Sequence, residues 1–378
     1  MSDLTKILHR TSSLLTHRPR GWKSLLYNTA MAKAKISGPL MLPVHISIEP
    51  TNACNLRCPV CETGNGSMER ATGLLDFDCY KALIDEVAPT TSVLLFYFMG
   101  EPFLHKKAYE MIRYARQKNI YVETCTNGDY VHPKGIIYSD VNDVSFQIGG
   151  MTQNTHEIYR VREKLSRVQA NLEGLISERK KTPQSNVKIN VGFVVMKHNE
   201  HEVPEFLRWA KEIGVDQANV IDPCVRNIEE GVKLLPEDKK YWFYDEDAFK
   251  KGILRPKHIP DNECTWIWNS TTINWDGSVV PCCRDPNGHH TFGNVFNTPL
   301  SKIWNGEEMR NFRRSILTAQ KTVDICKLCS GYGVPQLLHS KPLGFEIKRL
   351  SLDETKLEIP NEEIPIKWQS PKIVTWKN

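Results

Sequence analysis

The chain has 378 residues, of which 40% are hydrophobic and 25% charged, and its formal net charge is +5. This length suffices for a barrel-sized domain of about 200 residues and one smaller module. The modest charge forms no basic stripe that would indicate a nucleic-acid partner, and no segment approaches the roughly 18 apolar residues of a transmembrane helix.

Eleven cysteines are many for a chain that begins without the pattern of a secretory signal peptide. Three of them lie between residues 54 and 61, and five lie between residues 264 and 329. Disulfide scaffolds are typical of small secreted proteins, whereas clustered cysteines in a longer chain indicate metal sites. We therefore expect a reduced, cytoplasmic protein that binds metal.

Residues 1–42 are basic and carry apolar residues at roughly helical spacing. Such a stretch can rest on an acidic membrane surface or on a partner. A helix packed against its own barrel is the more common arrangement, so we expect a basic N-terminal helical extension of that kind.

Residues 43–223 alternate short apolar runs with helical patterns, which predicts six βα units. Consecutive βα units give parallel strands joined by right-handed crossovers. Six units are too few for a closed eight-stranded barrel, so the predicted fold is α/β, a partial (β/α)6 TIM-like barrel with its chemistry at the C-terminal strand ends. The expected strands are 44–49, 92–99, 120–125, 141–148, 186–196 and 217–222, and the expected helices include 76–87, capped by Asp76, 106–117, 162–179 and 203–213.

Cys54, Cys58 and Cys61 follow the first expected strand in a C-x3-C-x2-C motif. Three thiolates on one loop can bind three irons of a cubane cluster and leave the fourth iron open for a ligand that is not protein. A zinc site usually takes four ligands in C-x2-4-C pairs, and a disulfide knot suits a small secreted chain. The motif therefore favours a cluster that binds and reduces a cofactor.

The motif resembles that of the radical S-adenosylmethionine (SAM) family, and later strand ends extend the resemblance. Met99-Gly100-Glu101-Pro102 is similar to the family's G-G-E-P motif, and Thr126-Asn127-Gly128 is similar to its T-N-G motif. The resemblance implies that the first of these motifs meets the cofactor's ammonium group and that Arg160 faces its carboxylate. The implied cofactor-binding residues are Gly100, Glu101, Thr126, Asn127, Gln147 and Arg160.

The end of the fourth expected strand departs from the family pattern. Relatives commonly have S-x-D-G there, whereas this chain has Gln147-Ile148-Gly149-Gly150. Gln147 can still hydrogen-bond a ribose hydroxyl or the cofactor carboxylate, because an amide both donates and accepts. The missing aspartate predicts a roomier or differently charged substrate pocket.

A second set of cysteines follows a connecting segment, residues 224–262. Asp276-Gly277 between apolar runs predicts a hairpin that ends at Cys282, and Cys326 and Cys329 form a later C-x2-C pair. Together with Cys264 these thiols provide four ligands, which would also suit a zinc ribbon.

Residues 263–340 resemble the auxiliary-cluster modules of radical SAM enzymes, called SPASM when long and twitch when short. The long form has further cysteines after the C-x2-C pair, but none follows Cys329, so one auxiliary cluster is the most that this module supports. The spacing is similar to that of the twitch aminocyclitol dehydrogenase of butirosin biosynthesis. The implied ligands are Cys264, Cys282, Cys326 and Cys329, with Cys283 as the alternative to Cys282, and residues 341–378 form a polar tail.

The other cysteines are isolated along the chain. Cys79 lies in an expected helix and is predicted to be a small buried hydrophobe. Cys125 points into or out of the barrel depending on strand phase, and we expect the outward orientation. Cys224 follows the sixth expected strand, near the substrate, and is the candidate catalytic residue because a thiol can return a hydrogen atom to a carbon radical.

The resemblance implies a radical SAM enzyme whose first 4Fe-4S cluster cleaves SAM to a 5′-deoxyadenosyl radical. We expect this radical to abstract hydrogen from a small-molecule substrate, a sugar, cyclitol or related metabolite, and an auxiliary 4Fe-4S cluster to accept the electron that oxidation releases. Epimerisation through Cys224 and peptide maturation are the alternatives within the family, and a zinc-binding interaction protein is the alternative outside it. An electron donor such as flavodoxin or ferredoxin is an expected partner.

Overall fold

The computed structural model describes residues 20–331, which contain an eight-stranded sheet in the order β6-β5-β4-β3-β2-β1-β7-β8. The first six strands pair in parallel with their neighbours. The predicted α/β partial barrel is therefore confirmed. The strands are β1 (His45–Ile48), β2 (Val93–Leu95), β3 (Tyr121–Thr126), β4 (Asp143–Ile148), β5 (Lys188–Val194), β6 (Gln217–Ile221), β7 (Ser270–Ile273) and β8 (Val279–Val280).

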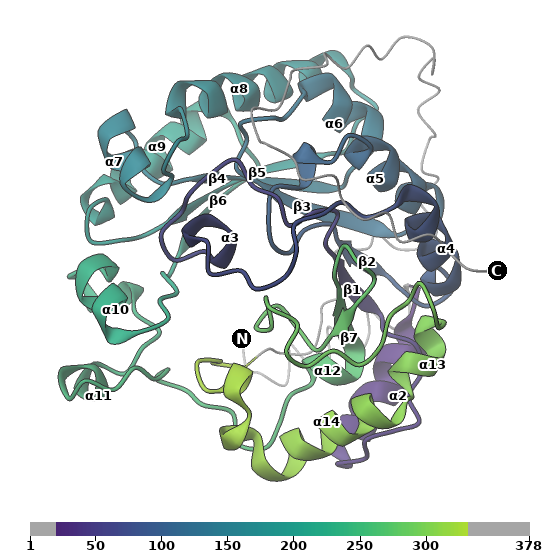
Figure 1. Cartoon of the computed structure of the whole chain (residues 1–378). Coiled ribbons are helices and arrows are strands. Elements are labelled where there is room, and N and C mark those ends of the chain that lie inside the picture. Colours follow the sequence, from purple (N-terminus) through teal and green to yellow (C-terminus); the bar gives the residue numbers. More distant parts are fainter. Residues whose placement is uncertain (1–19, 332–378) are drawn as a thin grey trace, which may run out of the picture.

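Helices follow the parallel strands and cover the outer face of the curved sheet (Figure 1). Asp76 caps α4 (Phe77–Val87) as expected, because its carboxylate accepts the backbone N–H groups of Asp78 and Cys79 at 2.9 Å. The helices between the first and sixth strands are α3 (Glu62–Asn65), α4 (Phe77–Val87), α5 (Ala108–Gln117), α6 (Pro133–Ser139), α7 (Gln153–Tyr159), α8 (Leu165–Lys181) and α9 (Val203–Ile213), and the connecting segment contains α10 (Ile228–Leu234) and α11 (Glu246–Lys250).

The hydrophobic core lies between the outer face of the sheet and helices α4, α5, α6, α8 and α9. Val122, Val144 and Phe146 are fully buried in it, whereas residues 123 and 125 of β3 and residues 143, 145 and 147 of β4, which alternate with them, are partly exposed. We call this partly exposed side the inner face of the sheet. It carries Tyr97, Glu123, Cys125, Asp143, Ser145 and Gln147.

The strand phase decides the orientation of Cys125. Val122 and Thr124 face the helices, so Cys125 lies on the inner face, and the expected outward orientation is wrong. Cys79 is 1% exposed within the core, as predicted.

The hairpin predicted around Asp276 is present, because β8 pairs antiparallel with β7. β7 also pairs in parallel with β1, with His45 opposite Ser270. The second cysteine module therefore extends the sheet of the barrel, an arrangement that the sequence does not indicate. α12 (Trp266–Asn269) precedes β7, and α13 (Leu300–Trp304) and α14 (Glu307–Ala319) follow the hairpin.

α2 (Trp22–Lys33) belongs to the basic N-terminal extension, of which residues 1–19 lie outside the described residues. This helix packs against α12, and Asn269 Nδ2 donates a hydrogen bond to Thr29 Oγ1 at 3.2 Å. No helix within residues 20–331 has both the length and the apolar character needed to cross a membrane.

Candidate active site

The C-x3-C-x2-C loop follows β1, and its three thiols are close enough to influence one another electrostatically. Burial raises the pKa of the Cys54 thiol to about 12, and the charges of Glu101, Cys58 and Cys61 add to that effect. Burial also raises the pKa of Cys58, against the opposing charge of Arg160. Thiols that resist ionisation together fit a site in which iron supplies the compensating positive charge.

Hydrogen bonds and close contacts hold this loop in place. Thr51 Oγ1 donates to the Gly73 carbonyl at 2.7 Å, which joins the start of the loop to its return segment. α3 then packs on Cys58, where a β-carbon at Gly64 would lie 2.4 Å from the Cys58 carbonyl oxygen. The close approach of α3 therefore excludes any side chain at position 64.

Glu101 follows β2 and is only 2% exposed. Its carboxylate accepts the Thr126 hydroxyl at 2.8 Å, the Asn127 N–H at 2.7 Å and the Phe103 N–H at 3.2 Å. Burial raises the pKa of Glu101 to about 7, although these hydrogen bonds oppose the shift. The structure thus brings three predicted cofactor-binding residues into one contact network.

Gly100 presses its backbone against the cysteine loop. A β-carbon at this position would lie 2.6 Å from the carbonyl oxygens of Thr51 and Ala53, and its φ of +78° is left-handed. Both constraints require glycine. The Glu101 N–H donates to the Ala53 carbonyl at 2.8 Å, so the G-E-P turn and the cysteine loop form one rigid unit.

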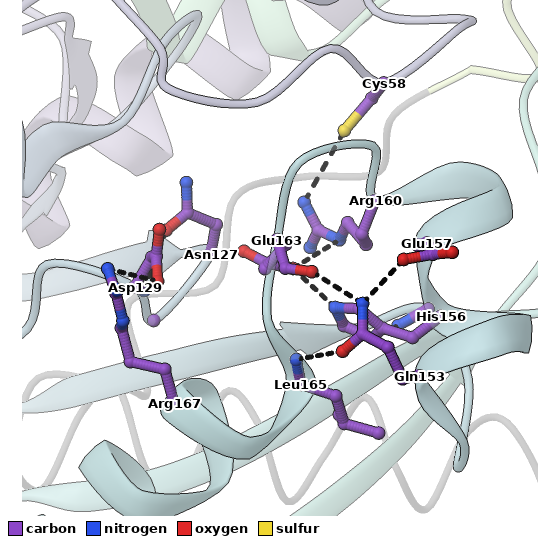
Figure 2. A network of polar contacts seen from close by, with 12 residues as sticks. Cys58, Asn127, Asp129, Gln153, His156, Glu157, Arg160, Glu163, Leu165 and Arg167 are labelled. Carbon is purple, nitrogen blue, oxygen red and sulfur yellow. Dashed lines mark hydrogen bonds and ion pairs between the residues drawn. The ribbon is translucent and has the colours of Figure 1, made fainter. Parts of the chain in front are cut away.

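Asn127 connects the T-N-G turn to the same loop. Its Nδ2 donates to Asn55 Oδ1 at 2.8 Å, and Asn55 Nδ2 donates to Asp129 Oδ2 at 2.8 Å. Asp129 pairs in turn with Arg167 of α8 at 3.2 Å (Figure 2). The polar side chains of the turn are therefore fixed between the cysteine loop and a helix.

Arg160 reaches the cysteine loop from the end of α7 (Figure 2). Its Nη1 lies 4.0 Å from the Cys58 sulfur, and its Nε lies 3.8 Å from Glu163 Oε2. Glu163 Oε2 also contacts His156 Nε2 at 2.8 Å. Glu163 further lines a cleft of about 610 Å³ formed by α7, α8 and the turn between them.

Gly149 stands where relatives commonly have the aspartate of the S-x-D-G motif, and its surroundings explain the difference. A β-carbon there would lie 2.8 Å from Arg160 Cγ. The space that an aspartate would occupy is therefore taken by Arg160.

The Gln147 side chain lies over Gly192 of the neighbouring strand β5. A β-carbon at Gly192 would be only 2.5 Å from Gln147 Oε1. Its Nε2 donates to Ser145 Oγ at 3.0 Å, and its side chain also hydrogen-bonds Cys125. Burial raises the pKa of Cys125 to about 11, with the charge of Arg160 opposing the shift. Cys125 therefore carries its proton at neutral pH, next to a predicted cofactor-binding residue.

The second cysteine set also comes together in space. Burial raises the pKa of Cys282, and the charges of Cys264 and Cys329 add to the shift. Burial also raises the pKa of Cys326 to about 12, with the same two charges adding to the shift. Cys282 is buried and Cys283 is exposed. Within residues 20–331, no three His, Cys, Asp or Glu side chains already converge as the ligands of a single metal ion would. Four neighbouring thiols fit an iron–sulfur cluster in the number and type of their donors.

Cys224 lies between the two cysteine loops. Its sulfur accepts hydrogen bonds from Arg226 Nη1 at 3.0 Å and from Arg284 Nη1 at 3.4 Å. Arg226 also pairs at 2.8 Å with Glu62, the residue after Cys61, and Arg284 follows Cys283. Cys224 is thus linked to each loop through one arginine, and neither arginine was predicted as a site residue.

Glu49 and Arg70 form a buried ion pair that sequence reasoning also missed. Two hydrogen bonds of 2.8 and 2.7 Å join them, and their side chains are 0% and 9% exposed. Arg70 Nε also donates to the Pro286 carbonyl at 2.6 Å, next to the second cysteine module. The sequence signal that could have indicated this ion pair is Glu49, a charged residue directly after the buried strand β1.

Comparison with known families agrees with this geometry. A family described as the radical SAM superfamily matches residues 48–210, and a SPASM iron–sulfur cluster-binding domain matches residues 264–330. A tungsten-containing aldehyde ferredoxin oxidoreductase cofactor-modifying protein of Pyrococcus furiosus is 24% identical over 322 residues, which cover 76% of this chain and 87% of that protein. An AdoMet-dependent heme synthase of Methanosarcina barkeri is 29% identical over 328 residues, which cover 76% and 90%.

Among solved structures, SuiB of Streptococcus suis bound to S-adenosylmethionine has the same fold. The TM-score is 0.59 at 14% identity, and the match covers 82% of this chain and 76% of that one. The chain is therefore a radical SAM protein with a C-terminal SPASM-type domain. Its cofactors are a 4Fe-4S cluster, SAM and an auxiliary iron–sulfur cluster.

Proposed function

We propose that this radical SAM enzyme is an oxidoreductase that acts on a small polar molecule held against the inner face of the sheet. The observation that carries this proposal is the character of that face. Glu123, Asp143, Ser145 and Gln147 remain partly exposed there, although strands of a parallel sheet are normally buried on both sides. A polar, accessible face at the centre of a barrel suits a polar ligand.

The first cysteine set holds the SAM-binding cluster in this proposal, and the second set holds the auxiliary cluster. When bound, the first cluster and SAM supply a hydrogen-abstracting radical, and the auxiliary cluster supplies an acceptor for the electron that oxidation releases. A flavodoxin or ferredoxin would provide the reducing electron. The ligands are Cys54, Cys58 and Cys61 in the first set and Cys264, Cys282, Cys326 and Cys329 in the second.

The residues around the cysteine loop bind and orient SAM. Gly100 and Glu101 receive its ammonium group, and Arg160 receives its carboxylate, because opposite charges pair best where water is largely excluded. Thr126 and Asn127 hold the Glu101 carboxylate in position through the contacts described above. Gln147, the remaining cofactor contact, supplies an amide at the end of β4.

Cys282 is supported over Cys283 as the fourth auxiliary ligand, because Cys282 is buried and the charges of two other auxiliary cysteines act on its pKa. Burial raises the pKa of Tyr97 on the inner face, and the charges of Cys125, Glu123 and Cys283 add to the shift. Cys283 therefore lies near Tyr97. The loop of the second cysteine set therefore reaches the place where the substrate would lie. This proximity suits electron transfer from the substrate to the auxiliary cluster.

Epimerisation is the second candidate, and it requires a protonated thiol. Cys224 accepts hydrogen bonds from two guanidinium groups, which hold its sulfur between the two cysteine loops. Cys125 keeps its proton and lies on the inner face. If epimerisation occurs, Cys125→Ala should abolish product while 5′-deoxyadenosine still forms, and Cys224→Ala should retain product containing solvent deuterium.

Cys282→Ala, with Cys283→Ala as its matched control, tests the oxidation directly. Candidate sugars and cyclitols deuterated at carbon are incubated with the anaerobically reconstituted enzyme, and deuterium in 5′-deoxyadenosine identifies a substrate. We expect Cys282→Ala to lose oxidised product but keep SAM cleavage, and Cys283→Ala to keep both. Oxidised product from Cys282→Ala at the parent rate would refute the role of the auxiliary cluster.

A further inference from the structure

The first cysteine loop reaches the surface between its own cysteines. Arg57 precedes Cys58 and Pro59 follows it, and both are exposed, whereas Cys58 itself is only 7% exposed. The Arg57 guanidinium lies against the loop, because its Nη1 donates to the Leu56 carbonyl at 2.9 Å and to the Cys54 carbonyl at 3.3 Å. An electron that enters the protein here therefore crosses a single layer of chain before it reaches a predicted cluster ligand.

The turn between α7 and α8 lies beside this loop, because the Arg57 N–H donates to the Val161 carbonyl at 3.1 Å. Two large apolar side chains are exposed here: Ile158, near the end of α7, is 49% exposed, and Val161 is 36% exposed. Arg162 follows with a φ of +79°, a left-handed conformation that is uncommon for a residue with a side chain. Exposed apolar side chains beside a turn of this kind suit a protein interface.

The exposed charges around these apolar side chains are mainly positive. Arg57, Arg162 and Lys164 are exposed, and within residues 20–331 none of them forms an ion pair with a carboxylate. Arg162 and Lys164 line the cleft of about 610 Å³ together with Glu157, which is exposed, and Glu163, which is buried. Three exposed cations therefore outweigh one exposed carboxylate.

We call these exposed side chains the loop–turn surface: Arg57, Ile158, Val161, Arg162 and Lys164. We propose that a reduced flavodoxin docks on this surface and delivers there the electron that cleaves SAM. This inference rests on the proposed function and specifies where its electron donor binds.

The chemistry of a flavodoxin matches the loop–turn surface in two respects. Flavodoxins are small acidic proteins, so their carboxylates would meet the three cations, and charge complementarity of this kind speeds association and selects the partner. Their flavin presents a hydrocarbon edge at the protein surface, which would meet the apolar side chains. One electron leaves the flavin hydroquinone, which becomes the semiquinone, and the electron is consumed when SAM is cleaved to methionine and the 5′-deoxyadenosyl radical.

Direct binding tests the surface without any turnover. Oxidised flavodoxin is titrated calorimetrically into the reconstituted, SAM-loaded enzyme, and we expect a complex that weakens as salt is added, because salt screens exposed charges. The double variant Arg162→Glu, Lys164→Glu should bind at least roughly 10-fold more weakly, since it places like charges opposite each other. The neutral double variant Arg162→Gln, Lys164→Gln should have an affinity between those of this variant and the parent.

The double variant Lys302→Glu, Arg314→Glu is the matched control. Lys302 of α13 and Arg314 of α14 are exposed, and these helices lie on the opposite side of the molecule from α7 (Figure 1). The control has the same change in net charge, so at physiological ionic strength it should bind flavodoxin like the parent. Unchanged affinity in both loop–turn variants, or an equal loss in the control, would overturn the proposal.

Two reductants separate this proposal from the proposed function. Dithionite is a small molecule that needs no docking surface, so with an excess of it all variants should form 5′-deoxyadenosine at the parent rate. With flavodoxin hydroquinone, the loop–turn glutamate variant should be at least roughly 10-fold slower than the parent and the control. If the parent forms none with dithionite, the proposed function fails irrespective of flavodoxin. If dithionite supports cleavage and flavodoxin does not, or only a ferredoxin does, the docking proposal alone is refuted.

Discussion

Glu123 of β3 illustrates how burying the charge of one side chain can reduce stability. Its pKa in the folded protein is about 7, against an ordinary value of 4.5. A carboxyl group with a raised pKa binds its proton more tightly in the folded state than in the unfolded state. Folding stability therefore falls as the pH rises from about 4.5 through 7. Glu101 is shifted in the same direction by burial.

Replacing Glu123 with glutamine should remove its share of this pH dependence. We expect Glu123→Gln to match the parent below pH 4.5 and to exceed its stability above pH 7 by on the order of 1 to 3 kcal/mol. Thermal unfolding of the reconstituted protein across this range measures the difference, with Glu205→Gln as the control. A difference that does not grow with pH would contradict the raised pKa.

At the scale of elements, the ion pair between Glu49 and Arg70 joins β1, the cysteine loop and the second cysteine module. Arg70→Met leaves the Glu49 carboxylate buried without its cation, which should cost about 3 to 5 kcal/mol of unfolding free energy. Adding Glu49→Gln removes that buried charge, so the double variant should be more stable than the sum of the single changes predicts. Denaturant unfolding measures each value, and simple additivity would exclude the coupling.

The sequence predicted the elements well because their signals are local. Asp76 caps α4 through contacts two and three residues away, and the six parallel strands follow from alternating apolar runs. The pairing of β7 with β1 joins residues more than 200 positions apart, and no local pattern specifies it. The inward phase of Cys125 was available from Val122, whose apolar side chain must face the helices.

The site shows the same division between local and distant information. Motif spacing placed Glu101, Thr126 and Asn127, which the structure brings into contact. The two arginines at Cys224 come from different parts of the chain, and their convergence depends on the tertiary fold. The position of Glu123 opposite Asp143 became visible only through the register of β3 and β4.

At the scale of the whole molecule, the two cysteine sets approach the inner face from different parts of the chain. The first follows β1, and the second is connected to the neighbouring β7 and β8. The extended sheet therefore holds both sets in one folded unit. Cys224, through its arginines, contacts residues beside each set.

The central claim is that the first set holds the cluster that cleaves SAM, and a triple alanine variant of Cys54, Cys58 and Cys61 tests it most directly. Anaerobically reconstituted parent protein should carry about eight irons and form 5′-deoxyadenosine with dithionite, while the variant should keep about four irons and form none. Undiminished 5′-deoxyadenosine formation by the triple variant would contradict the account.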